Sequence, residues 1–176
     1  MKRPFLAPLP VILLCAALCI ACIQSHREVA RLLVQAEALM EAYPDSARQC
    51  IEAIQHTSDL PEDYRMRYCL LSVYIKAKTG SDISNDTLIV EAKNYFLQQK
   101  DFPRAALAAF YSGRVWQYRG DNRALQAYLE AGEWVEHIAD SLLKGRVVRN
   151  IGLLYYDSWA DYQSAIPHLK NSRRYI

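Results

Sequence analysis

The sequence predicts an all-helical protein built as an α-α superhelix of about four helical hairpins. Apolar residues recur every three or four positions along most of the chain, which is the period of an amphipathic helix. Only 6 of the 176 residues are Gly, and no alternating β-branched run indicates a strand. A helix-turn-helix pattern over residues 105–135 recurs later in the chain, and recurrence at a fixed period is typical of solenoids.

Residues 1–21 have the pattern of an export signal. Lys2 and Arg3 precede an apolar core over residues 11–21. This core has about 11 residues, whereas a membrane-spanning helix needs roughly 20. The sequence Leu18-Cys19-Ile20-Ala21-Cys22 resembles the lipobox of bacterial lipoproteins, although Cys19 stands where Leu is usual. The resemblance implies that the thiol of Cys22 receives a lipid and that Cys22 becomes the new N-terminus.

Lipidation of Cys22 would anchor the mature protein to a membrane surface, since several acyl chains together give stable anchoring. Cleavage without lipidation and a retained hydrophobic helix are the alternatives. Cys19 is a weaker rival site for the lipid, because Leu18 before it is larger than Ala21 before Cys22. Residues 22–27 form a short polar tether. No acidic residue directly follows Cys22, so retention at the inner membrane is not indicated. We therefore expect the periplasmic face of the outer membrane.

The helical domain, residues 28–176, is expected to open with two hairpins. The first helix covers residues 28–42, and Pro44 with Asp45 or Ser46 starts and caps the second, which runs to about Ile54. A third helix begins at Pro61 and ends at residues 79–82. A fourth, capped by Asn85 or Asp86 and carrying inward-facing Leu88, runs to about residue 100.

The third hairpin, residues 105–135, has the clearest pattern. Small and large residues alternate along its two predicted helices at Ala106, Ala109, Gly113, Trp116, Ala124, Tyr128, Ala131 and Val135. Gly120-Asp121 is a helix stop. A Gly inside a helix costs about 1 kcal/mol relative to Ala, so Gly113 indicates a close approach between helices, with Ala124 expected opposite it.

The fourth hairpin repeats the pattern at Val148, Ile151, Gly152, Tyr155, Tyr162, Ala165, Leu169 and Ser172. Gly152 follows Gly113 by 39 residues, and Ala165 follows Ala124 by 41. Gly113, Trp116, Gly120, Ala124, Tyr128 and Ala131 resemble the tetratricopeptide repeat signature. Residues 36–54 resemble the opening hairpin of tetratricopeptide envelope lipoproteins from Bacteroidetes. The period exceeds the usual 34 or so residues, which we interpret as longer helices.

The resemblance implies a non-catalytic scaffold that binds a protein or peptide. In such repeats the first helix of each pair lines a concave groove. The matching residues are Phe110, Arg114, Gln117, Tyr118, Arg146, Arg149 and Tyr156. Arg and aromatic residues are common in binding surfaces, although ordinary core packing and surface exposure are the alternative. Longer members of the family continue into signalling or DNA-binding segments, so the alternative function is an input module of a larger regulatory protein.

The sequence indicates no catalytic residue, metal site or cofactor. The four His residues share no short spacing with one another or with Cys, and Gly80-Ser81-Asp82 is interpreted as a turn between helices. Glu130, Glu133 and Glu136 are interpreted as a solvated face.

Composition gives no support to nucleic-acid binding. Without residues 1–21 the 21 basic residues fall to 21 − 2 = 19, equal to the 19 acidic residues. Cys50 and Cys69 are expected to be separate small core residues, although an oxidising envelope would permit a disulfide.

Overall fold

The computed structural model describes residues 26–175, so the predicted export signal and Cys22 lie outside the described part of the chain. A first helix covers residues 26–39. It is followed by α2 (Pro44–Glu52), the short 3-10 helix η1 (Thr57–Asp59), α3 (Glu62–Lys78), α4 (Ile89–Gln98), α5 (Phe102–Tyr118), α6 (Arg123–Val135), α7 (Ser141–Trp159) and α8 (Tyr162–Ser172). Residues 26–175 contain no strand. The predicted all-helical class is confirmed.

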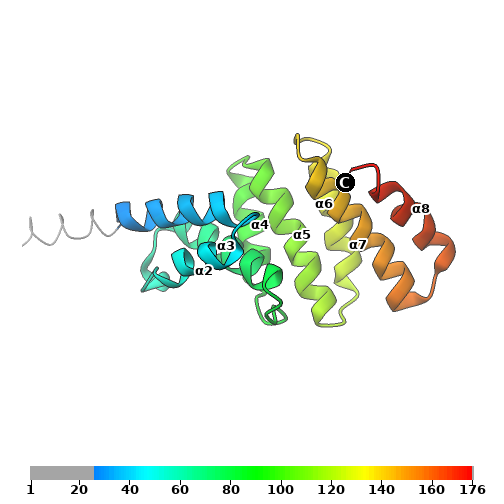
Figure 1. The fold of residues 1–176 in the computed structure, drawn as a ribbon, viewed down its shortest axis with the longest axis horizontal. Helices are drawn as coiled ribbons and strands as arrows, with labels where there is room; N and C mark the ends of the chain where they lie inside the picture. The colour runs from blue at the N-terminus through cyan, green and yellow to red at the C-terminus, as the bar shows by residue number, and fades with distance from the viewer. Residues whose placement is uncertain (1–25, 176) are drawn as a thin grey trace, which may run out of the picture.

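The helices stack in the order of the chain. From α2 to α8 each helix packs against the next, and α3 also contacts α5. Figure 1 shows α4 to α8 side by side in a row that leads away from the blue first helix toward the red C-terminal end. Stacking of this kind buries the apolar face that a single hairpin leaves uncovered. The architecture is superhelical and solenoid-like, as the sequence predicts.

Three of the helices start at an aspartate cap. Asp101, Asp140 and Asp161 each accept a hydrogen bond from the backbone N–H three residues later, at 3.2, 2.8 and 3.1 Å. The side chain thereby satisfies a donor that the first helical turn leaves free. These caps set the starts of α5, α7 and α8.

The caps predicted for α2 and α4 were wrong. The N-cap of α2 is Tyr43, and no side chain caps the helix, which Pro44 begins. The N-cap of α4 is Leu88, again without a side-chain cap, because the carboxylate of Asp86 pairs with Lys76 at 2.8 Å instead. As α4 starts later than expected, the side chain of Leu88 is 41% exposed, and Ile89 takes the buried position.

Gly113 lies at the closest approach of α5 and α6. A Cβ atom at Gly113 would stand 2.5 Å from Cδ1 of Tyr128, so the predicted close contact is confirmed but its partner is Tyr128 and not Ala124. Tyr128 is fully buried, and its hydroxyl donates to Oε1 of Gln117 at 2.7 Å. The same approach recurs between α7 and α8, where a Cβ at Gly152 would stand 2.9 Å from the side chain of Leu169.

Candidate binding surface

The first helix, α3, α5 and α7 contribute to one surface, which we call the shared face. The rings of Tyr74 on α3 and Tyr111 on α5 lie 5.1 Å apart. Glu37 of the first helix pairs with Arg67 on α3 and Arg104 on α5. The turn after the first helix reaches α7 through an ion pair between Glu41 and Arg146. These contacts bring together helices that are distant in the sequence.

Two of the predicted groove residues lie elsewhere. Phe110 is 2% exposed and packs against the rings of Tyr111 and Tyr128 at 5.1 and 5.7 Å. It is a core residue, so its assignment to an accessible groove was wrong. Gln117 is partly buried and accepts the hydrogen bond from Tyr128. Phe110, Gly113 and Gln117 recur at helical spacing on the side of α5 that faces α6.

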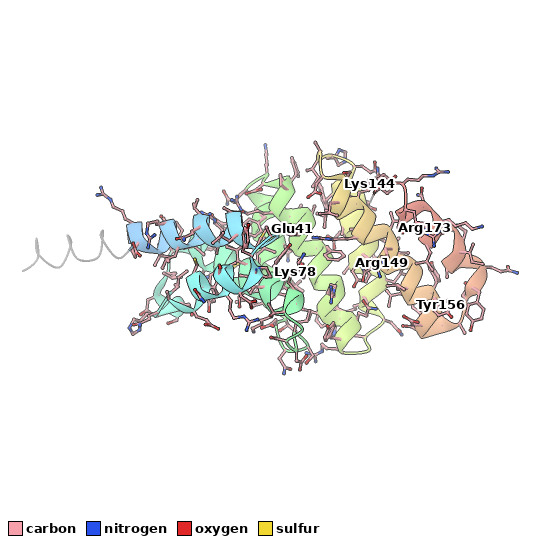
Figure 2. All side chains as sticks on the ribbon, viewed as in Figure 1. Glu41, Lys78, Lys144, Arg149, Tyr156 and Arg173 are labelled. Atoms are coloured by element: carbon pink, nitrogen blue, oxygen red, sulfur yellow. The ribbon has the colours of Figure 1, made fainter. Side chains whose placement is uncertain are left out.

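Glu41 is the centre of a polar cluster on the shared face. Its carboxylate accepts hydrogen bonds from the Tyr74 hydroxyl, from Nζ of Lys78 at 3.1 Å and from the guanidinium of Arg146. Figure 2 shows Glu41 and Lys78 close together near the end of the first helix. Arg146 is 105 residues further along the chain. No local sequence pattern predicts a contact of that separation, so Glu41 was not among the predicted site residues.

The surroundings of Glu41 change its acidity. Burial disfavours its charge, but the hydrogen bonds from Tyr74, Arg146 and Lys78 outweigh burial and lower the pKa of Glu41 to about 2. Burial and the hydrogen bond to Glu41 raise the pKa of Tyr74 to about 12. Around pH 7 Glu41 is therefore ionised and Tyr74 is neutral. The hydrogen bonds from Tyr74, Lys78 and Arg146 stabilise the negative charge on the Glu41 carboxylate.

Stability should fall in acid partly because of Glu41. Its pKa is lowered from 4.5 to about 2 on folding. A carboxyl with a lowered pKa stabilises the fold above its unfolded pKa and loses that contribution as the pH falls through the folded pKa. Glu41→Gln removes the titrating group, so its melting midpoint should depend less on pH between about 4.5 and about 2. Parallel curves for the two proteins at constant ionic strength would contradict this.

Glu37 forms a second ion-pair centre on the shared face. Its carboxylate receives Nε and Nη2 of Arg104 at 2.9 and 3.0 Å, a forked arrangement, and Nη2 of Arg67 at 3.1 Å. The guanidinium of Arg104 also donates to Asp101, the residue that caps α5. Only 13% of the Arg67 side chain is exposed. These pairs tie the first helix to α3 and α5.

Among the remaining predicted residues Tyr118, Arg149 and Tyr156 are exposed, whereas Arg114 and Arg146 are partly buried. Nη2 of Arg114 lies 3.5 Å from the hydroxyl of Tyr118, and its guanidinium is 5.6 Å from the centre of that ring. The rings of Tyr156 and Tyr162 pack edge to face at 5.2 Å. Tyr118 is 47% and Tyr156 51% exposed. Arg149 is also exposed, and neither it nor Arg114 forms an ion pair within residues 26–175.

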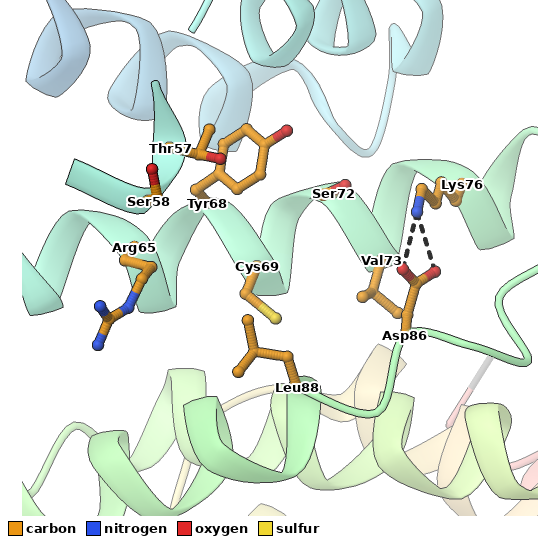
Figure 3. Close-up of a pocket in the computed structure, with 10 residues that line it drawn as sticks. All are labelled: Thr57, Ser58, Arg65, Tyr68, Cys69, Ser72, Val73, Lys76, Asp86 and Leu88. Carbon is orange, nitrogen blue, oxygen red and sulfur yellow. Dashed lines mark hydrogen bonds and ion pairs between the residues drawn. The ribbon is translucent and has the colours of Figure 1, made fainter. Parts of the chain in front are cut away.

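A hollow of about 350 Å³ lies beside α3, away from these residues. Figure 3 shows Tyr68, Thr57 and Ser58 on one side of α3 and Leu88 on the other. At one end Lys76 pairs with Asp86. Cys69 lines this hollow, and burial raises the pKa of its thiol to about 12. A neutral thiol is a poor nucleophile, so Cys69 is not an activated group.

The predicted environments of the two cysteines and of Glu130 can be compared with the structure over residues 26–175. Cys50 and Cys69 are both free and buried, as predicted. Within these residues no group of His, Cys, Asp and Glu is arranged to hold a metal ion. No helix in the same range has the length and apolar character needed to cross a membrane. One interpretation was wrong: Glu130 is not simply solvated, because both of its oxygens pair with Nζ of Lys93 at 2.8 Å.

Comparisons with protein-family models, with curated proteins and with solved structures find no match to this chain. The fold and the candidate surface of residues 26–175 place the protein in a structural class. It is an all-helical stack of neighbouring helices with an arginine- and tyrosine-bearing face.

Proposed function

We propose that this protein is a lipid-anchored, non-catalytic scaffold of the tetratricopeptide type that binds a protein or peptide through its shared face. The observation that carries the proposal is a set of four side chains on α5 and α7: Tyr118, Arg149 and Tyr156, which are exposed, and the partly buried Arg114. Exposed tyrosines supply large contact area with little rotamer entropy to lose, and arginines supply forked hydrogen bonds. Rigid helices hold both kinds of group in place.

Peptide binding can be tested by selecting ligands from a library of short random peptides. Tyr118→Ala and Tyr156→Ala together should weaken the selected peptides at least about tenfold, which corresponds to about 1.4 kcal/mol, because hot spots are enriched in aromatic residues. Tyr43→Ala is the matched control, since Tyr43 is 64% exposed but lies at the start of α2. Absence of any selectable peptide, or equal weakening by the control, would contradict the proposal.

The lipid anchor is tested separately, at a residue outside the described range. Cys22→Ala removes the thiol that would form the thioether, so the full-length protein should move from the detergent phase to the aqueous phase on extraction. Cys19→Ala should leave the protein in the detergent phase. Unchanged partitioning of the Cys22 variant would exclude Cys22 as the lipidation site.

A further inference from the structure

We propose that the partner of the shared face carries an acidic segment, and that Glu41 occupies part of the partner's site in the free protein. This inference rests on the binding function proposed above and specifies its ligand. The predicted occupant is an extended peptide segment with several carboxylates and with apolar groups between them.

Glu41 shows how the surface holds a carboxylate. A hydroxyl, an ammonium and a guanidinium, from Tyr74, Lys78 and Arg146, converge on its two oxygens. Glu41 itself lies in the turn after the first helix, and 47% of its side chain is exposed. An internal carboxylate on an exposed turn can be displaced without opening the core, whereas its three partners belong to the helices α3 and α7.

Further positive charge lies beside this cluster without a matching carboxylate. Arg114 follows Tyr111 by three residues on α5 and therefore lies on the same side of that helix, the side on which the Tyr111 ring packs against Tyr74. Arg149 follows Arg146 by three residues and therefore lies on the same side of α7. Arg146 pairs with Glu41, whereas Arg114 and Arg149 form no ion pair within residues 26–175.

The chemistry of these groups selects the partner. A guanidinium presents a planar fork that matches a carboxylate, and the group observed in the site is a carboxylate. Tyr118 and Tyr156, about half exposed on α5 and α7, offer rings against which apolar parts of the same segment can pack. A segment that alternates acidic and apolar or aromatic residues satisfies both features.

The probes are three peptides of equal length built from repeats of Glu-Tyr-Gly, Gln-Tyr-Gly and Lys-Tyr-Gly, with inorganic polyphosphate as a fourth. Fluorescence anisotropy at physiological salt should show the Glu peptide binding at least about tenfold more tightly than the Gln peptide. The double variant Arg114→Glu/Arg149→Glu should lose the Glu peptide and prefer the Lys peptide. Arg48→Glu on α2, a second helix of its pair, is the matched control and should bind like the wild type.

The role of Glu41 has its own measurement. Glu41→Gln frees Lys78 and Arg146, so it should bind the Glu peptide several-fold more tightly than the wild type. Glu41→Asp keeps the charge but shortens the side chain, and should show a smaller gain. If Glu41→Gln does not fold, the Asp variant decides. If the folded variants bound the Glu peptide no more tightly than the wild type, the claim that the partner displaces Glu41 would be wrong.

The outcomes separate this inference from the function on which it rests. Equal affinity for the Glu and Gln peptides, with both weakened by Tyr118→Ala, would overturn the acidic partner and leave peptide binding standing. Polyphosphate binding as tightly as the Glu peptide would also overturn it, in favour of a surface for any anion. Failure of all library peptides to bind would overturn both proposals.

Discussion

Replacing Gly113 by Leu should destabilise the protein by about 1 to 3 kcal/mol or more, because it inserts a side chain into a contact that is already closed. Even a single Cβ would stand 2.5 Å from Cδ1 and 2.6 Å from Cε1 of Tyr128. Tyr128 has little room to move, since it is fully buried and its hydroxyl is bonded to Gln117. Urea unfolding at neutral pH measures the change.

Gly132 provides the matched control in the neighbouring helix. A Cβ there would lie 3.8 Å from Cγ1 of Val147, an ordinary contact. Gly132→Ala should therefore stabilise the protein by about 0.5 to 1 kcal/mol through helix propensity, whereas Gly113→Ala should destabilise it. If Gly113→Ala also increased the free energy of unfolding, the approach of α5 and α6 at Tyr128 would be looser than described.

Replacing Glu37 by Gln should destabilise the protein by about 1 to 3 kcal/mol. The variant leaves Arg67, whose side chain is 13% exposed, without its carboxylate, and Nε of Arg67 already lacks a partner within the described residues. A charge left unpaired in the interior is strongly unfavourable. Solvent at Glu37, which is 30% exposed, reduces the effect below that of a fully buried pair.

Glu28→Gln is the control for this prediction. Glu28 pairs with Arg31 three residues later on the same helix, and 55% and 61% of the two side chains are exposed. Pairs so exposed contribute little, so the melting midpoint of this variant should match that of the wild type. If Glu37→Gln also melts like the wild type, the pairing of the first helix with α3 and α5 is not a source of stability.

Local sequence patterns predicted most of the helices correctly. The breaks at Pro44, Pro61 and Gly120 depend on backbone conformations that these residues favour on their own, and Gly120 does adopt φ +67°. The buried stripes that include Ala36, Ile51 and Ala131 follow from helical periodicity alone. Helix ends were less predictable where a polar side chain could either cap a helix or form an ion pair. Asp86, for example, pairs with Lys76 and does not cap α4.

The candidate surface was predictable only in part. The resemblance to tetratricopeptide repeats implied Arg114, Arg149 and Tyr156 as groove residues; Arg149 and Tyr156 are exposed, and Arg114 is partly buried. Helical periodicity could not separate Phe110 from Arg114, because residues four apart lie on the same side of a helix. The position of α6, which brings Tyr128 against Phe110, decides that Phe110 is core.

The sequence by itself therefore determined the helical class, the hairpin pattern and the need for a small residue at Gly113. Each of these depends on neighbours within about one hairpin, where spacing is set by the helix period. The tertiary structure alone decided that Tyr128 closes on Gly113, that Glu37 joins three helices and that Glu41 meets Arg146. Those contacts depend on how successive hairpins stack, and a contact across 105 residues leaves no periodic trace in the chain.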